Sequence, residues 1–441
     1  MSKVSYDMVI DEAEEYILSL RHIGDVKDAV WEAYCELGST CSRRCGEGLS
    51  ILILTAPCYG FGDIIFAVKL GGYLRDWYGC RVTFVTTHGA GFQRMGVPAR
   101  DIVQLNSKSK NVECRRFGLL TPERTIPAAD LMFIAPVPTN YDASLTDVKR
   151  LVKGSNQFNT FFFSEYNHDS PTDFPTGIGP GTYGIFLSNV TVKLGKPAGL
   201  TSPYAVAYIT DTSPGHERCL YSFMEMVAAK YNGHTRFDIV VPSWVCEEIG
   251  HFARTIVKRV KPYFPNVDFV GKDKKREVLV RANSGANITK LLTIRCDVFP
   301  LPIPEMLRLI KASVPDILLT GDQSVSDCLS CCPSKTIWYQ ITPWKGSFGK
   351  GLAKELPQKY LASKTTSCGT LKALKYRSSF KRFLDKWDFR KLAKPKLDAI
   401  ILAAKARRSS DQVREFERML MKTKKLAPLK RMINNSGISG R

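Results

Sequence analysis

The sequence of 441 residues contains no apolar run of about 18 residues or more, so we expect no membrane-spanning helix. Its first residues, MSKVSYDMVIDEAEEY, are acidic and amphipathic and lack the basic and apolar regions of a secretory signal. These two absences predict a cytoplasmic protein. The chain is long enough for two or three domains, each with a full hydrophobic core.

The sequence also lacks a complete metal site. Cys328 and Cys331 form a Cys-x-x-Cys pair, but no second pair or nearby histidine supplies the other two ligands of a tetrahedral site. The 13 cysteines are mostly scattered and odd in number, so we expect reduced thiols and no disulfide framework. No Asp-x-Asp stands in a credible metal-binding turn, and we therefore expect no metal and no cofactor.

Two common nucleotide-binding motifs are absent as well. Gly60-Phe61-Gly62 follows a predicted strand, but the third glycine of a dinucleotide fingerprint is missing and Asp63 would bring a negative charge toward a pyrophosphate. The next predicted strand ends in Thr-Thr-His over residues 86–88, where an acid that binds a ribose would be expected. There is no P-loop lysine motif either. The sequence thus disfavours NAD binding.

What the chain does have is a regular alternation of strands and helices. A nearly continuous apolar strand over 49–55, a glycine-rich turn, a helix over 64–78 and a strand over 81–86 form a β-α-β unit. Further strands of this half are expected at 102–105, 131–135 and 160–164. A second alternation has helices expected at 217–231, 244–260 and 304–312, and strands at 205–209, 237–241, 267–270, 278–281, 291–294, 317–319 and 336–341.

The sequence therefore predicts an α/β fold of two Rossmann-like domains facing each other. The expected segments are a helical extension over 1–48, a first domain over 49–200, a second domain over 201–360 and a basic helical tail over 361–441. The tail carries much of the charge: residues 371–441 hold 21 Lys or Arg against 6 Asp or Glu, a net of +15 out of +21 for the chain. Such a tail could bind a polyanion or an acidic membrane surface, although solvated helix faces have the same composition.

The stretch Asp316–Lys345, DILLTGDQSVSDCLSCCPSKTIWYQITPWK, predicts a ligand-binding turn between a buried strand and a helix. Free backbone N–H groups and the helix dipole favour an anion at such a turn, and Gly321 would let the main chain approach it. Ser324 is expected to cap the helix, with Asp327 in a box-like spacing. An ordinary β-α-β turn without a ligand is the alternative.

A second group of candidates lies in the first half. The carboxylate of Asp63, at the start of a helix, could take a proton from an acceptor hydroxyl or amide, or it could simply cap that helix. His88 and His168 lie at predicted strand ends, where a base could face a cleft, but lone histidines are often structural. The Pro- and Gly-rich segment 167–188, which includes Gly179, is too irregular for a helix and is either a functional loop or a surface excursion.

These turns resemble those of the GT-B glycosyltransferases. The resemblance rests on Gly62-Asp63 opening the first helix and on VFPLPIPEMLRLIKASVPDILLTGDQSVSDCLSCCPSKTIWYQITPW, which is similar to the nucleotide-sugar half of that fold. Nearest in motif are the bacterial protein-arginine rhamnosyltransferases, with a Phe-x-Pro before the helix, a Gly-acid-x-Ser turn and an aromatic-rich strand. The resemblance covers about 45 residues of the second half of the chain and about 30 of the first half.

The resemblance implies that Asp63 acts on the acceptor and that Asp322 contacts a nucleotide sugar, with Ser324 on its diphosphate. It implies neither arginine as the acceptor nor rhamnose as the donor. Together with their positions at turns and strand ends, this gives the expected donor-binding residues Gly321, Asp322, Gln323, Ser324, Tyr339, Gln340 and Lys345. The expected acceptor or cleft residues are Gly60, Gly62, His88, His168 and Gly179.

The predicted function is metal-independent transfer of a sugar from a nucleotide-sugar donor to an unidentified acceptor, with the nucleotide sugar as substrate and not as cofactor. Two alternatives remain open at this point. One is a nucleotide-sugar epimerase or hydrolase of the same fold. The other is a non-catalytic protein that binds nucleic acid or acidic membrane through its basic tail.

Overall fold

The computed structural model describes residues 45–57, 61–107, 120–137, 145–155, 159–167, 172–188, 195, 199–211, 215–247, 249–281, 290–340, 342, 346–375 and 380–408. Most of the predicted helical extension and the last part of the tail, residues 409–441, lie outside this part of the chain. The chain divides into two compact units. Unit 1 comprises Met1–Glu165, Asp169–Thr176 and Phe389–Arg441, and unit 2 comprises Tyr166–His168 and Gly177–Asp388.

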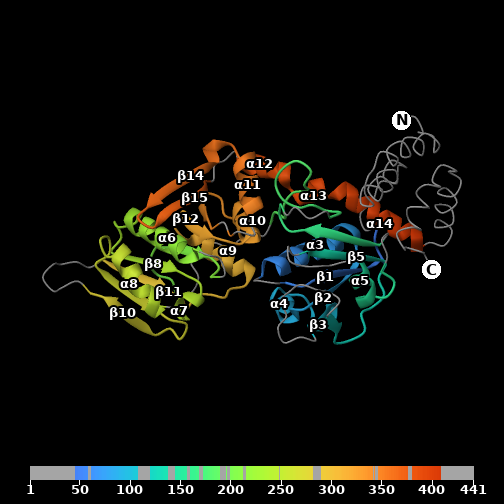
Figure 1. Cartoon of the computed structure of the whole chain (residues 1–441), viewed down its shortest axis with the longest axis horizontal. Coiled ribbons are helices and arrows are strands. Elements are labelled where there is room, and N and C mark those ends of the chain that lie inside the picture. Colours follow the sequence, from blue (N-terminus) through green and yellow to red (C-terminus); the bar gives the residue numbers. More distant parts are fainter. Residues whose placement is uncertain are drawn as a thin grey trace. The chain divides into compact units, whose positions relative to one another are not determined.

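Unit 1 contains a six-stranded sheet in the order β4-β3-β2-β1-β5-β6 (Figure 1). Its strands run parallel, except that β4 pairs antiparallel with β3 at one edge. The strands are β1 (Ser50–Thr55), β2 (Arg81–Thr86), β3 (Ile102–Ser107), β4 (Leu120–Pro122), β5 (Leu131–Val137) and β6 (Thr160–Ser164). The five parallel strands lie where apolar runs predict them, because a parallel sheet is buried on both faces.

The helices described for unit 1 are α3 (Gly62–Tyr78), α4 (Gly89–Arg94), α5 (Leu145–Leu151), α13 (Phe389–Leu392) and α14 (Lys394–Arg408). Helix α3 ends at Gly79, whose φ of +71° favours glycine. Helix α14 comes from the basic tail, yet its side chains Leu397, Ile400 and Ile401 have no exposed surface. The apolar run LDAIILAA, residues 397–404, thus packs into a core.

Unit 2 contains a nine-stranded sheet in the order β10-β9-β11-β8-β7-β12-β13-β15-β14 (Figure 1). The six strands from β9 to β13 in this order are parallel, and β10, β15 and β14 are antiparallel to their neighbours. The strands are β7 (Tyr204–Tyr208), β8 (Arg236–Val240), β9 (Asn266–Val270), β10 (Arg276–Val280), β11 (Leu291–Arg295), β12 (Asp316–Leu319), β13 (Thr336–Tyr339), β14 (Leu361–Thr366) and β15 (Gly369–Lys375). The helices are α6 (His216–Lys230), α7 (Trp244–Glu247), α8 (Ile249–Val260), α9 (Ile303–Ala312), α10 (Asp322–Cys331), α11 (Gly346–Glu355) and α12 (Phe380–Leu384). The protein is therefore a mixed α/β protein with two sheets.

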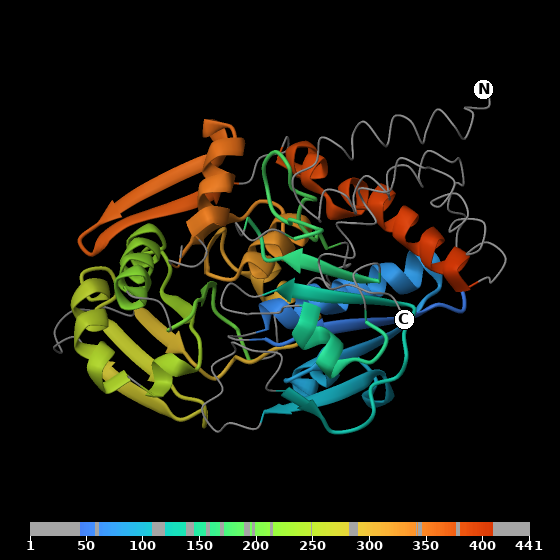
Figure 2. The same cartoon turned by 45° about the vertical axis from the view of Figure 1, so that its right-hand side comes forward.

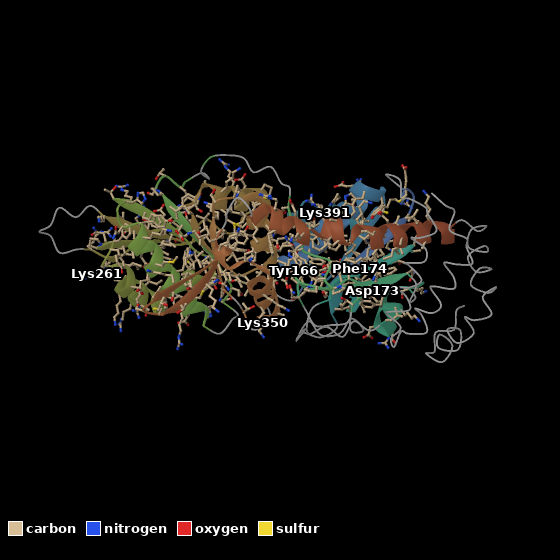
Figure 3. All side chains as sticks on the ribbon, turned by 90° about the horizontal axis from the view of Figure 1, so that it is seen from above. Tyr166, Asp173, Phe174, Lys261, Lys350 and Lys391 are labelled. Atoms are coloured by element: carbon tan, nitrogen blue, oxygen red, sulfur yellow. The ribbon has the colours of Figure 1, made fainter. Side chains whose placement is uncertain are left out.

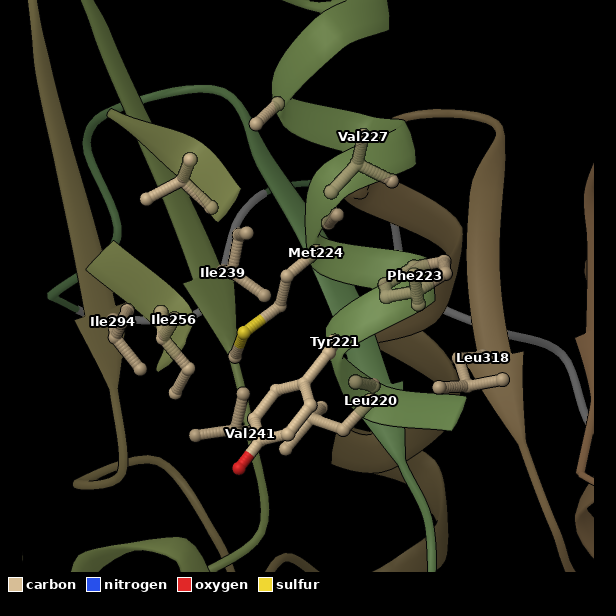
Figure 4. Close-up of a cluster of buried hydrophobic side chains, with 14 of the residues drawn as sticks. Leu220, Tyr221, Phe223, Met224, Val227, Ile239, Val241, Ile256, Ile294 and Leu318 are labelled. Carbon is tan, nitrogen blue, oxygen red and sulfur yellow. The ribbon is translucent and has the colours of Figure 1, made fainter. Parts of the chain in front are cut away.

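The main core of unit 2 lies between α6, α8 and the sheet (Figure 4). Phe223, Met224 and Val227 of α6 have no exposed surface. In Figure 4 Met224 extends toward Ile239 of β8, whereas Phe223 lies on the side of Leu318 of β12. Burying each of these large side chains contributes about 1.5–3 kcal/mol, so the cluster fixes α6 on this face of the sheet.

The predicted helical tail is wrong at its beginning. Residues 361–375 form the antiparallel hairpin β14–β15, which extends the sheet of unit 2 beside β13 (Figure 2). The lysine-rich composition indicated helix, but Thr365, Thr366 and Thr370 favour strand, and Gly369 lies at the turn with a φ of +149°. The helical pattern resumes at α12.

The described residues of the segment between Asn167 and Ser188, which are 167 and 172–188, form no helix, as predicted. In unit 2, Asn167 donates to the carbonyl of Ile178 (2.7 Å) and accepts from its N–H (2.9 Å), and Thr182 Oγ1 donates to the carbonyls of Gly177 and Gly179. A Cβ atom at Gly177 would lie 2.3 Å from Asn167 Oδ1, and its φ is +134°. This part of the loop is therefore held by its own hydrogen bonds.

Two expectations drawn from absences can be compared with the structure. Cys45 is disulfide-bonded, so the prediction of reduced thiols throughout is wrong for this residue, while the eight other described cysteines are free. Sequence spacing gave no signal for this bond, because the scattered cysteines show no recognisable framework. Among the helices described here, none is both long and apolar enough to cross a membrane.

Candidate functional site

Each sheet has one place where the strand order changes direction. In unit 2 the chain places β8 on one side of β7 and later places β12 on its other side. In unit 1 the same reversal occurs at β1, between β2 and β5. Ligands of open α/β sheets bind outside the carboxyl ends of the strands at such points. The turns singled out in the sequence follow β12 in unit 2 and β1 in unit 1.

Polar side chains connect the carboxyl ends of three strands at the reversal in unit 2. The Thr320 hydroxyl, after β12, donates to Gln340 Oε1 after β13 and accepts from the N–H of Thr210 after β7 (3.3 Å). Gln340 Nε2 in turn donates to the carbonyl of Thr210 (3.4 Å). Thr320 and Gln340 are buried. The predicted ligand residue Gln340 thus lies at this edge, where it holds the strand ends together.

Helix α10 begins at Asp322, and its N-cap lies three residues before Ser324, the cap predicted from the sequence. Gly321 is the N-cap, with φ −69° and ψ 129°, and no side chain caps the helix. The prediction that Ser324 is the N-cap is therefore wrong, because Ser324 already lies in the first helical turn. The first N–H groups of a helix have no partner within it, so those of Asp322, Gln323 and Ser324 are oriented toward this edge of the sheet.

Gly321 and Ser324 lie close together at the start of α10, and both are partly exposed. A Cβ atom at Gly321 would be 3.2 Å from Ser324 Oγ, so a larger residue would displace that hydroxyl. In the described part of the chain the Ser324 hydroxyl makes no hydrogen bond. Ser324 therefore offers a donor next to the N–H groups of the helix terminus, which is the arrangement that binds a phosphate.

Asp322 and Tyr339 form a buried pair beside this terminus. The Tyr339 hydroxyl donates to Asp322 Oδ1 at 2.5 Å, and the side chains keep little exposed surface. Burial raises the pKa of the Tyr339 hydroxyl well above its usual value, and the nearby Asp322 carboxylate raises it further. The phenol therefore stays protonated and continues to donate to Asp322.

Gln323 is buried and its amide is used inside unit 2. Its Oε1 accepts from the Tyr166 hydroxyl (3.1 Å), and its Nε2 donates to Asp327 (3.0 Å) and to the carbonyl of Phe186 (3.3 Å). Tyr166, labelled in Figure 3, also accepts from the N–H of Phe186 (2.8 Å). These bonds attach α10 to the irregular segment, so Gln323 holds the turn in position and its amide is not available to a ligand. Gly179 belongs to the same segment, with a φ of +132° and no atom within 4 Å of its Cβ direction.

In unit 1 the candidate carboxylate lies at the start of α3. The helix begins at Gly62, its N-cap is Phe61 without a side-chain cap bond, and Asp63 lies in the first turn, half-buried. A negative charge there is stabilised by the helix dipole. Thr55, the last residue of β1, has a fully buried hydroxyl without a hydrogen-bond partner in the described residues. This edge therefore combines a carboxylate, a buried hydroxyl and open space at Gly62.

His88 follows β2 at the same edge of the sheet in unit 1. Its Nδ1 accepts from the N–H of Gly91 at 3.1 Å, which caps α4, and its ring centroid lies 6.0 Å from that of Phe61. The side chain is exposed. The structure thus gives His88 a capping role through Nδ1 and leaves Nε2 on the solvent side. Three predicted site residues lie outside the described residues: Gly60, His168 and Lys345.

Sequence reasoning missed Thr55, Thr210 and Tyr166 at these edges. The two threonines carried a weak signal, since each is a polar residue where an apolar strand ends. Tyr166 carried none, because its bond to Gln323 joins residues that are 157 positions apart. In the described residues no cluster of three or more His, Cys, Asp or Glu side chains is placed to hold a metal ion.

No family model matches the chain, and no curated protein matches it. Similar solved structures include a glycosyl transferase family 9 protein from Veillonella parvula, with 9% identity over 82% of this chain and 99% of that chain and a TM-score of 0.29. The heptosyltransferase WaaC of E. coli with ADP has 11% identity over 61% of this chain and 81% of its own, with a TM-score of 0.26. An E. coli trehalose-6-phosphate structure bound with UDP-2-fluoro glucose has 11% identity over 92% and 82% of the two chains, with a TM-score of 0.24. TM-scores this low do not establish a shared fold, so the function has to be judged from this chain's own residues.

Proposed function

We propose that this protein is a glycosyltransferase that uses a nucleotide-sugar donor, and that the donor binds at the carboxyl edge of the sheet in unit 2. The observation that carries the proposal is the start of α10 at the reversal of strand order, where the first N–H groups of the helix have no partner within it and the Ser324 hydroxyl makes no hydrogen bond among the described residues. A diphosphate is the ligand that fits such a terminus. A nucleotide-sugar donor is also what the resemblance of the turns to those of the GT-B glycosyltransferases implies. The narrower resemblance to the protein-arginine rhamnosyltransferases is not used to assign the acceptor or the sugar.

The same groups suit the chemistry of sugar transfer. When the bond from the sugar to the diphosphate breaks, negative charge grows on the leaving oxygen, and prearranged N–H and hydroxyl donors stabilise it. The Asp322 carboxylate would repel a diphosphate, but it is buried against Tyr339. We therefore place the phosphates on the Ser324 side and give Asp322 the role of orienting the turn and contacting the sugar nucleotide.

Ser324→Ala should weaken donor binding and leave stability unchanged, because the hydroxyl has no hydrogen-bond partner in the described part of the chain. Loss of a hydrogen bond to a charged phosphate costs about 1.5–3 kcal/mol, or roughly a tenfold to hundredfold rise in Kd. Calorimetry with the tightest sugar nucleotide measures the change, and Ser347→Ala, an exposed hydroxyl on α11, is the control. Equal affinities of the two variants would remove Ser324 from the site.

Unit 1 would bind the acceptor, with Asp63 as the base or the group that orients it. Asp63→Asn should lower kcat by about two or more orders of magnitude and change donor Kd little, since an amide keeps the shape but cannot accept the proton. Steady-state kinetics and donor calorimetry on one preparation measure both. If the variant loses only thermal stability, and each folded molecule turns over normally, the carboxylate serves the helix and not the reaction.

A thermal-shift screen against UDP, GDP, CDP and TDP sugars tests the proposal as a whole. A ligand that binds the native state alone raises Tm, so at least one of these sugars should do so. Assays of any hit in the presence of EDTA check the expectation of metal independence. Release of free sugar without an acceptor, or conversion of the sugar itself, would indicate a hydrolase or epimerase. Tight nucleic-acid binding with no response to any sugar nucleotide would contradict the proposal and favour a non-catalytic binding protein. The cytoplasmic location stays a prediction from the sequence.

A further inference from the structure

Unit 2 contains a cavity of about 540 Å³ that the donor turn does not use. It lies between α11 and the hairpin β14–β15, which are neighbours in Figure 2. Its volume falls within the range of about 300–1,000 Å³ that is typical of small-molecule sites. A cavity of this size beside an added hairpin is a candidate binding site of its own.

The walls of this cavity are mainly apolar. Leu352 and Ala353 of α11 line it together with Leu361 of β14 and its cross-strand partner Leu374 of β15. Ala362 and Ala373 also line it, although their side chains belong to the core beside α6. The ring of Tyr339 lines one part of it, with its hydroxyl donating to Asp322. Apolar walls of this kind favour a hydrocarbon chain, because each buried methylene group contributes about 0.8 kcal/mol.

Two lysines lie at the margin of the cavity. Lys350 of α11 (labelled in Figure 3) and Lys372 of β15 are both exposed and both line it. Neither forms an ion pair or a hydrogen bond within the described part of the chain, and no carboxylate is among the lining residues. Two uncompensated ammonium groups beside an apolar wall are complementary to an anionic head group on an apolar chain.

We propose that this cavity binds a single-chain anionic amphiphile, with the hydrocarbon chain between α11 and the hairpin and the phosphate or carboxylate head between Lys350 and Lys372. The proposal does not rest on the proposed function, because the two lysines and the apolar side chains that carry it lie outside the start of α10. Tyr339 lines the cavity with its ring, and its hydroxyl is already bonded to Asp322. A sugar nucleotide is a poor alternative occupant, since the walls offer few hydrogen-bond partners for a base or a ribose.

Calorimetry with dodecyl phosphate, kept below its micelle concentration, tests the proposal on the full chain. Saturable binding is expected, together with much weaker binding of dodecyl maltoside, which has the same chain without the charge, and of inorganic phosphate, which has the charge without the chain. The double variant Lys350→Glu and Lys372→Glu should weaken binding about tenfold or more, as expected for two exposed charge pairs. Ala353→Trp should abolish binding by filling the cavity from an exposed helix position.

The matched control is Lys354→Glu with Lys364→Glu, two exposed lysines of α11 and β14 that do not line the cavity. It changes the net charge equally and should bind as the native chain does. Melting curves of all variants show whether they fold. The proposal would be overturned if dodecyl phosphate did not bind, or if dodecyl maltoside bound equally well. It would also be overturned if both double variants weakened binding equally, or if Ala353→Trp left binding intact. If Ala353→Trp instead removes sugar-nucleotide binding, the cavity belongs to the donor site.

Discussion

A chain that ends at Ala393 should not fold unit 1. The truncation removes α14, whose Leu397, Ile400 and Ile401 have no exposed surface, together with Asp398, which accepts a hydrogen bond from the buried Tyr78 hydroxyl (2.5 Å). Three such side chains contribute about 5–9 kcal/mol at about 1.5–3 kcal/mol each, and a domain is stable by only about 5–15 kcal/mol. The loss is therefore comparable with the whole stability of the unit.

Hydrogen exchange measured by mass spectrometry checks this prediction. Amides of β1, β2 and β5 should lose their protection, while those of unit 2 between residues 204 and 375 should keep it. A chain that ends at Arg408 is the control and should resemble the full protein. Ile400→Asp in the complete chain should act in the same direction as the truncation, because it buries an unpaired charge. Full protection of β1 in the chain that ends at Ala393 would mean that α14 is not part of this core.

Asp322→Ala should destabilise unit 2 as well as weaken donor binding. Alanine leaves the buried Tyr339 hydroxyl without its acceptor, at a cost of about 1–3 kcal/mol, and removes a charge that is favourable at the start of a helix. The stability cost arises because the carboxylate does not lie on an exposed loop: Asp322 is 8% exposed.

A double-mutant cycle with Tyr339→Phe separates the two effects. The variant with both changes should be more stable than the sum of the single losses predicts, by about 0.5–3 kcal/mol, because the second change removes the group that the first left unpaired. Denaturant unfolding gives the free energies, and calorimetry of the folded fraction gives donor affinity. Additive losses of stability would show that the 2.5 Å hydrogen bond contributes nothing.

The fold was largely predictable because its signals are local. Apolar runs such as 49–55 are long enough to indicate buried strands, and α6, α8 and α9 follow from helical spacing between polar turns. The hairpin β14–β15 was missed because its lysines and alanines are also good helix formers, and only tertiary pairing with β13 selects the strand. The start of α10 was placed three residues late because Ser324 and Asp327 match a cap pattern that the helix does not use.

The candidate site was predictable only as a pair of turns. Gly321, Asp322 and Ser324 follow from the strand, turn and helix pattern, but the pattern cannot distinguish which side chains are used internally. Gln323 looks like a ligand residue in the sequence, and its hydrogen bonds to Tyr166 and Phe186 depend on long-range packing. Tyr339 was likewise expected to bind the donor, but its hydroxyl donates to Asp322.

The division of the chain has a consequence for its synthesis. Unit 1 takes its strands from the first 165 residues and its last helices from residues after 388, and unit 2 is encoded almost entirely between them. A ribosome adds about 5–20 residues per second, so the sheet of unit 1 would wait roughly 10–45 s for α14 to emerge. Unit 2 can be complete first, which reverses the usual order in which the N-terminal domain folds before the next. During that interval the apolar surface reserved for α14 is uncovered, and the nascent chain should depend on chaperones for as long as translation of the second unit lasts.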